Sequence, residues 1–339
     1  VGAVRTFVMA LFAIVGIGFG FLVFMAVIGA ISSSTGSKEI ETHYTLEILP
    51  NADGVRKEIS KKAPVILQIN IDGVIGTETL NTSTIRQQLV ESREGDLKKD
   101  RVKAILLNIN TPGGTVVDSD NIYRALNAYK EQYKVPIYAY VDGMCASGGM
   151  MAACAADKIY ANNVSLIGSV GVIAGWYMNF SKVLSKYDIQ TLSFSEGKGK
   201  DELNPIRPWG PNEGDTLQAI MHYYYDMFVT IVNTARPAIG KDKLVKDYGA
   251  KVFPAPQAKE YGFIDESGIS REATLKLLLT EIGIEDDYYQ VVQMHSQDWL
   301  SKIFTSKNTL WQGKITHTLD LSEDYNPALS GKLLYLYRP

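Results

Sequence analysis

The stretch VPIYAYVDGMCASGGMMAACAADKIYA, residues 135–161, joins an apolar run of β-type residues to a segment of very small side chains. The run up to Val141 is typical of a buried strand, and the segment after Ser147 is compatible with a helix. Ser147 then lies at the N-terminus of that helix. Such a serine is either a helix cap or a nucleophile whose small neighbours let a substrate backbone approach, and the local sequence leaves both open.

The same alternation continues toward the N-terminus. Strands are predicted within residues 63–73 (APVILQINIDG) and 101–111 (RVKAILLNINT). Helices are predicted within 83–94, after a Ser or Thr cap, and within 118–133. Strands of nearly continuous hydrophobicity that alternate with helices favour an α/β fold, with a parallel sheet covered on both faces.

Two glycine-rich loops follow neighbouring predicted strands. TPGG, residues 111–114, ends one strand, and MCASGG, residues 144–149, ends the next. In open α/β sheets the ligand crevice lies outside the carboxyl ends of the strands, so we expect both loops at one site. The backbone N–H groups at the start of the following helix add a partial positive charge there.

A serine nucleophile needs a base, and histidine is scarce. None of the four histidines lies in a strand-end loop, which disfavours a Ser/His/Asp triad: His43, His222, His295 and His317. Lysine is the other candidate, because burial or positive neighbours can make its amine neutral. Lys198 and Lys200 lie in the Gly-rich loop SFSEGKGKDELNP, after the strand-like IQTLSF.

The bulk composition excludes some classes of function. The 339 residues include 34 basic and 37 acidic side chains, a formal net charge of −3, which gives no sign of a nucleic-acid partner. Cys145 and Cys154 lie nine residues apart among small residues, which indicates buried thiols rather than a disulfide. No His flanks them, so a structural metal site is not expected.

The N-terminal segment predicts a membrane anchor. Residues 7–31 form a run of 25 uncharged, mostly apolar residues, and about 20 suffice to cross a bilayer as a helix. Arg5 precedes this run, and the positive-inside rule then places the N-terminus in the cytoplasm and the rest outside. We therefore expect an anchor over 1–32 and a polar tether over 33–62.

Six motifs in order resemble the signal peptide peptidase A family of membrane-anchored Ser/Lys peptidases: INIDGVIG, NINTPGG, ASGGMMAACAADKIYAN, LIGSVGVI, SEGKGKDELNP and AKEYGFIDESG. The resemblance covers residues 64–279. It implies the fold shared by Clp protease and the crotonases, with layered parallel sheets and flanking helices. It also implies a peptidase domain over 63–284 that needs no metal or cofactor.

The resemblance also implies a role for individual residues. Ser147 is expected to be the nucleophile, Lys200 the general base, and Ser169 the residue that orients the lysine amine. The oxyanion hole is expected to use the backbone N–H of Gly148 and that of one of two glycines, Gly113 or Gly114. Nothing in the sequence decides between these two.

The family implies further expectations about the whole molecule. The chain resembles the short form with one copy, whose members assemble as rings in which Ser and Lys from neighbouring subunits meet. The expected substrates are cleaved signal peptides and other hydrophobic peptides. The expected location is the bacterial inner (cytoplasmic) membrane, with the catalytic domain on the extracytoplasmic side. The remaining tail, 285–339, is expected to pack or regulate, with LLYLY (333–337) as a strand in the cleft.

Three other functions remain open at this stage. A related Ser/Lys membrane protease would cut one specific membrane protein, and a crotonase-type enzyme would act on acyl-CoA. An inactive scaffold would bind membrane proteins without cutting them.

Overall fold

The structure is a computed structural model that describes residues 44–60, 62–296 and 334–337. The predicted anchor, 1–32, lies outside these residues. Among the helices that are described, none is both long and apolar enough to cross a membrane.

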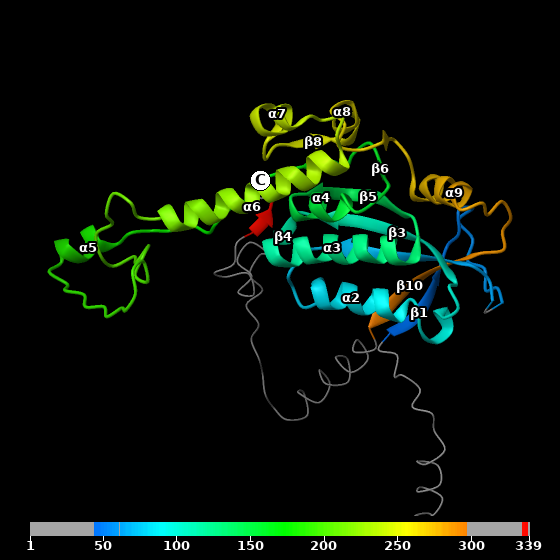
Figure 1. Ribbon diagram of the computed structural model, residues 1–339, viewed down its shortest axis with the longest axis horizontal. Coiled ribbons are helices and arrows are strands. Elements are labelled where there is room, and N and C mark those ends of the chain that lie inside the picture. The colour runs from blue at the N-terminus through cyan, green and yellow to red at the C-terminus, as the bar shows by residue number, and fades with distance from the viewer. Residues whose placement is uncertain (1–43, 61, 297–333, 338–339) are drawn as a thin grey trace, which may run out of the picture. The chain divides into compact units, whose positions relative to one another are not determined.

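A mixed β-sheet forms the centre of the described chain (Figure 1). Its strands run in the order β1-β10-β2-β3-β5-β6-β9, and β7 pairs with β5 and β8 with β7. Neighbours from β10 to β9 are parallel, as is β7 on β5, while β1 and β8 are antiparallel. The strands are β1 (Tyr44–Leu49), β2 (Val65–Asp72), β3 (Val102–Thr111), β5 (Ile137–Ala146), β6 (Lys158–Ala161), β7 (Leu166–Gly168), β8 (Val252–Pro254), β9 (Glu266–Ser267) and β10 (Gln290–Ser296).

The helices follow the strands in an alternating order (Figure 1). They are α2 (Thr82–Glu91), a 3₁₀ turn (Gly95–Leu97), α3 (Val116–Tyr133), α4 (Gly148–Ala153), α5 (Ser181–Lys186), α6 (Asp215–Ala235), α7 (Lys241–Lys243), a π-helical turn (Leu244–Tyr248), α8 (Ala255–Glu260) and α9 (Arg271–Glu281). A separate small ladder joins β4 (Gly113–Thr115) to β11 (Leu334–Leu336).

Both faces of the sheet are buried, as the continuous apolar strands predict. One cluster joins alternate residues of β2, β3 and β5 to Ile85 and Leu89 of α2 and to Ile122 and Leu126 of α3. The other cluster takes the opposite residues of the same strands and packs them on α9. Strands and helices near the predicted positions are thus confirmed for the centre of the fold.

Three local predictions differ from the structure. Residues 44–49, expected in the polar tether, form β1, which pairs with β10 from the predicted tail. IQTLSF, residues 189–194, is not a strand, and all six residues are exposed. Helix α2 is capped by Asn81 rather than by Ser or Thr, because the Asn81 side chain accepts the backbone N–H groups of Ser83 and Thr84.

Helix α6 is buried along its C-terminal half only. Phe228, Val229, Ile231 and Val232 are its buried residues, whereas no residue from Asp215 to Met227 is buried. Figure 1 draws α5 and the segment that leads into α6 beyond the N-terminal end of α6. We call residues 173–214 the arm. It carries exposed apolar side chains, among them Trp176, Leu192 and Phe194 at 83%, 80% and 90% exposure.

Candidate active site

The carboxyl ends of four strands meet at one edge of the sheet. The register pairs Asp72 with Asn110, Thr111 with Cys145, and Ala146 with Gly168. The loops that follow β2, β3, β5 and β7 therefore begin side by side. This confirms the expectation that the TPGG and MCASGG loops lie at one site.

Ser147 lies where β5 ends and α4 begins, with an unusual backbone. Its φ of 55° and ψ of −117° are rare for a residue with a side chain and indicate local strain. The Ser147 side chain makes no capping hydrogen bond to α4. The helix-cap interpretation is therefore wrong.

Ser169 lies directly beside Ser147. The backbone N–H of Ser147 donates to the Gly168 carbonyl at 2.8 Å, one residue before Ser169. Ser169 also has a φ of 55°, and its own N–H donates to the Lys251 carbonyl at 2.7 Å. Two buried serines with left-handed backbones thus end neighbouring parallel strands.

The TPGG turn presents only one of its two glycines outward. Gly113 donates its N–H to the Thr111 hydroxyl at 3.0 Å, and its carbonyl accepts the Ile75 N–H at 2.8 Å. Thr115 N–H donates to the Ile75 carbonyl at 2.9 Å. Both polar backbone groups of Gly113 are thus used inside the protein, and by strand alternation those of Gly114 point to the other side.

The C-terminal strand lies on that other side. β11 pairs antiparallel with β4, with Tyr335 opposite Gly114, and the Tyr337 N–H donates to the Pro112 carbonyl at 2.7 Å. Hydrogen-bonded pairs recur at every second residue of an antiparallel ladder, so Tyr335 and Gly114 are the next such pair. The expectation of a tail strand at this edge is confirmed for residues 334–336.

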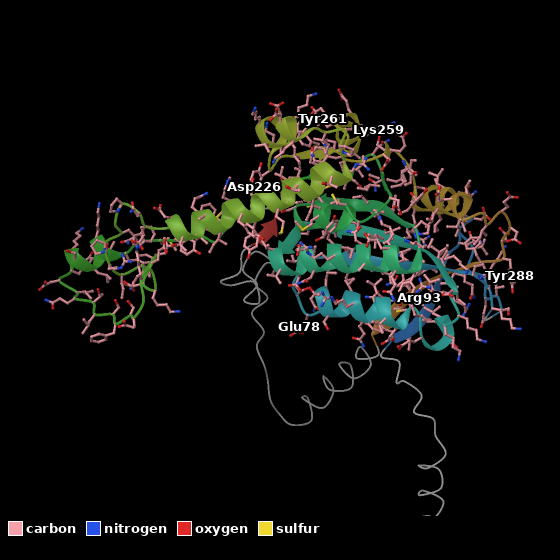
Figure 2. All side chains as sticks on the ribbon, viewed as in Figure 1. Glu78, Arg93, Asp226, Lys259, Tyr261 and Tyr288 are labelled. Atoms are coloured by element: carbon pink, nitrogen blue, oxygen red, sulfur yellow. The ribbon has the colours of Figure 1, made fainter. Side chains whose placement is uncertain are left out.

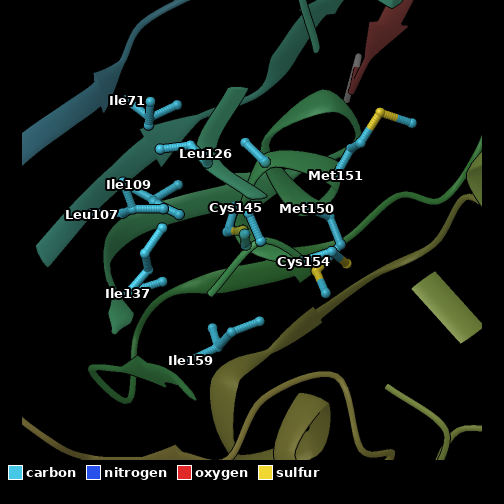
Figure 3. Packing of buried hydrophobic residues seen from close by; sticks show 14 of the residues in the cluster. Ile71, Leu107, Ile109, Leu126, Ile137, Cys145, Met150, Met151, Cys154 and Ile159 are labelled. Atoms are coloured by element: carbon cyan, nitrogen blue, oxygen red, sulfur yellow. The ribbon is translucent and has the colours of Figure 1, made fainter. Parts of the chain in front are cut away.

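Ser147 is not accessible in this structure. It is 1% exposed, and the adjacent Gly148 is buried as well, so the expectation that small neighbours expose them is wrong here. Strand β11 contacts both α3 and α4, and it therefore lies over the end of the sheet that carries Ser147. In Figure 3 the side chain of Met151 on α4 extends toward β11.

The structure does not bring Lys200 to Ser147. Lys198 and Lys200 are both exposed, in the part of the arm between α5 and α6. The buried end of α6, at Phe228, follows the arm by about 20 Å of helix, at 1.5 Å per residue. α4 contacts α6, whose only buried residues are at that end. Ser147 and Ser169 thus lie side by side, whereas Lys200, the predicted base, lies on the arm.

A charged network holds the turn that carries Lys200. Arg207 donates to the Asp201 carboxylate at 2.5 Å and to both oxygens of Glu213 at 2.9 and 3.0 Å. The hydrogen bonds from Arg207 and from the Leu203 N–H lower the pKa of Glu213 to about 2. Hydrogen bonds from Asn204 and Arg207 likewise lower the pKa of Asp201.

This network was missed in the sequence analysis. The acidic residue directly after Lys200 and the lone arginine in NPIRPWGP are visible in the sequence. Their pairing could have been proposed, because opposite charges a few residues apart in a Gly- and Pro-rich loop often close a turn. A bidentate contact between Arg and a carboxylate fixes the relative orientation of the two side chains in addition to pairing their charges.

The remaining titratable candidates take no part in the site. Cys145 and Cys154 are free and buried in the core shown in Figure 3, and burial raises the pKa of both thiols. His222 is exposed on α6 at 3.4 Å from Asp226, which Figure 2 labels. His295 pairs with Glu47 across β10 and β1. The other two histidines lie outside the described residues.

The chain matches the model of Peptidase family S49 over residues 129–281. The match covers less than half of the chain, so the chain is similar to peptidase family S49 over these residues. A second match, to the Clp protease model over residues 67–166, agrees with the Clp protease-like α/β fold. Ser147 lies within both matched ranges. The S49 match supports a serine peptidase.

Proteins with related sequences carry protease names. A putative protease of Methanocaldococcus jannaschii is 34% identical over 54% of this chain and 58% of its own length. A putative protease of Synechocystis is 28% identical over 86% of this chain and 100% of its own. A putative signal peptide peptidase SppA of Enterococcus faecium is 29% identical over 75% and 74%. Among solved structures, a ClpP1 mutant of Listeria monocytogenes covers 61% of this chain and 94% of its own, at 16% identity and a TM-score of 0.41.

Proposed function

We propose that this chain is a membrane-anchored endopeptidase that uses a Ser/Lys dyad, with Ser147 as nucleophile and Lys200 as general base. The observation that carries the proposal is the strained, non-capping Ser147 beside a peptide strand that is already paired to the TPGG turn. An extended peptide that adds to a free strand edge presents its backbone carbonyls in a fixed register. The pairing of β11 with β4 supports a substrate position at this edge.

The dyad forms between two copies of the chain. Within one chain Lys200 is exposed on the arm, and the arm's apolar side chains are exposed as well. Exposed apolar patches of this kind are typical of interfaces between proteins. A neighbouring copy that covers the arm would bury Lys200 near its own Ser147, and burial is what makes a lysine amine available as a base. Repetition of a head-to-tail contact of this kind closes a ring when the rotation between neighbouring copies closes on itself.

The chemistry then follows from the groups present. The neutral Lys200 amine takes the proton from the Ser147 hydroxyl, whose oxygen attacks the carbonyl carbon of the peptide bond. The backbone N–H groups of Gly114 and Gly148 stabilise the oxyanion. The lysine ammonium, oriented by Ser169, donates its proton to the leaving amine, and the same lysine next activates water to hydrolyse the acyl-enzyme.

Hydrophobic peptides near a membrane, including cleaved signal peptides, are the proposed substrates. The uncharged run at residues 7–31 supports an anchor in the bacterial cytoplasmic membrane, and the flanking Arg5 supports an extracytoplasmic catalytic domain. Recognition through backbone pairing with β4 fits substrates without a fixed polar side chain. An enzyme anchored in the membrane would meet such peptides at the membrane surface.

Labelling with a fluorophosphonate tests the nucleophile and the base together. We expect the wild-type chain to be labelled, Ser147→Ala to lose the label, and Lys200→Ala to lose most of it. Lys198→Ala is the matched control, because Lys198 is exposed in the same loop two residues away. It should be labelled like the wild type.

Two outcomes would reject the assignment. Labelling that survives in Ser147→Ala means that another residue is the nucleophile. If neither the wild type nor a chain without residues 333–339 is labelled, the result favours the scaffold or an acyl-CoA enzyme. Equal loss in Lys198→Ala and Lys200→Ala, or loss in Lys198→Ala alone, rules out Lys200 as the specific base.

A further inference from the structure

The TPGG turn rests on one buried hydroxyl. Thr111, the last residue of β3, is fully buried, and its Oγ1 donates to the Gly73 carbonyl at 2.5 Å. The same oxygen accepts the Gly113 N–H at 3.0 Å. The Thr111 hydroxyl therefore joins the loop after β2 to the turn after β3.

These contacts decide which amide of the turn points outward. With its N–H on Thr111 and its carbonyl on the Ile75 N–H, Gly113 cannot turn toward a bound peptide. The N–H of Gly114 can turn toward a bound peptide. The Gly114 backbone also packs closely on Ile75, because a Cβ on Gly114 would lie 1.9 Å from the Ile75 carbonyl oxygen. The side of Gly114 that remains open is the side on which Tyr335 pairs.

The methyl group of Thr111 contacts the second half of the oxyanion hole. A Cβ on Gly149, the second residue of α4, would lie 2.5 Å from the Thr111 Cγ2. The start of α4 therefore packs directly on this side chain. Thr111 thus touches both segments that carry the proposed donors, one through its hydroxyl and the other through its methyl group.

We propose that Thr111 is a positioning residue that aims the Gly114 N–H, rather than that of Gly113, into the oxyanion hole. This inference rests on the proposed function, in which Gly114 and Gly148 stabilise the oxyanion. The hydroxyl keeps Gly113 turned inward, and the methyl group sets the distance between the turn and α4. Thr111 itself does not touch the substrate.

Two substitutions separate the hydroxyl from the methyl group. Thr111→Val keeps the branched shape and loses the hydroxyl, whereas Thr111→Ser keeps the hydroxyl and loses the methyl group. In the full-length protein we expect Thr111→Val to lower kcat for a fluorogenic peptide by about 10- to 100-fold, with KM changed by less than about twofold. Thr111→Ser should keep kcat within about threefold of the wild type, because it retains the hydroxyl.

Stability must be measured on the same samples, since loss of the hydroxyl removes the hydrogen bonds to the buried Gly113 N–H and to the partly buried Gly73 carbonyl. A purely structural role predicts that kcat follows the melting temperature in both variants, and this result would overturn the proposal. So would a Thr111→Val enzyme with normal kcat. If Thr111→Val does not fold, the pair Thr111→Ala and Thr111→Ser, which differ only by the hydroxyl, gives the same comparison.

The proposed function is tested separately in the same assay. Hydrolysis that persists in Ser147→Ala refutes the assignment of the nucleophile, whatever Thr111 does. Hydrolysis that is lost in Ser147→Ala but unchanged in Thr111→Val refutes only the role of Thr111.

Discussion

Removal of the C-terminal strand should activate the enzyme. Strand β11 occupies the edge of β4 that a substrate strand would use, so the two compete. Deletion of residues 333–339 removes the competitor and uncovers the end of the sheet that carries Ser147. We expect faster hydrolysis of a short fluorogenic peptide at substrate concentrations below KM.

The magnitude follows from the ladder. The Tyr335–Gly114 pair and the bond from the Tyr337 N–H to the Pro112 carbonyl give about three backbone hydrogen bonds. Each bond contributes about 1 kcal/mol, and the entropy lost when the tail becomes ordered offsets part of this stabilisation. The net free energy that holds β11 on β4 is then about 1–2 kcal/mol. That free energy corresponds to an increase of about 5- to 30-fold in kcat/KM.

A pair of point substitutions tests the backbone contact without removing the tail. Tyr337→Pro lacks the N–H that donates to Pro112, whereas Tyr337→Ala keeps it. The proline variant should be activated by about 2- to 10-fold over the alanine variant, the value of one such bond. If the deletion leaves the rate unchanged, the tail does not compete with substrate and the reasoning fails.

Three further outcomes follow from the arm and the dyad. Ser147→Ala and Lys200→Ala chains are each expected to be inactive alone. When they are co-expressed, about a quarter of the wild-type activity should return, because half of the serines and half of the neighbouring lysines are intact. No recovery means that the dyad is not shared between copies. Arg207→Lys keeps the charge but loses the two-pronged contact with Glu213, so kcat should fall by about 3- to 10-fold. An unchanged kcat would show that the contacts of Arg207 do not position the loop that carries Lys200. The pKa of Glu213 is lowered from 4.5 to about 2, so the stability that its carboxylate gives to the loop is complete above pH 4.5 and is lost as the pH falls toward 2. The indole N–H of Trp209 donates to a carbonyl in this loop, so its NMR signal should shift in that pH range and stay constant in Glu213→Gln.

The centre of the fold and half of the site were predictable from the sequence. β2, β3 and β5 are nearly continuous apolar runs, and only a sheet covered on both faces buries most residues of such a run. Parallel pairing then places their carboxyl ends together, which brings the TPGG turn next to Ser147. The motifs after those strands needed no knowledge of distant contacts.

Strands that depend on a distant partner were not predictable. Tyr44–Leu49 has no strong alternation, yet it forms β1 because β10, about 250 residues later, offers an edge. IQTLSF has the composition of a strand but finds no edge, and Leu192 and Phe194 stay exposed. Composition therefore gives the capacity to pair, and the availability of a partner decides whether a strand forms.

The same distinction separates the two halves of the proposed dyad. The strained backbone of Ser147 is held by contacts within one chain, because Gly168 accepts its N–H and β5 and α4 fix its two sides. Lys200 is held only within its own turn, by the network around Arg207, while its surroundings stay open. Burial under another surface is one way to make a lysine amine neutral enough to act as a base. In the proposed mechanism, catalysis therefore depends on two events. One is the arrival of a neighbouring copy at the arm, which a single copy cannot supply, and the other is the departure of the chain's own β11 from β4.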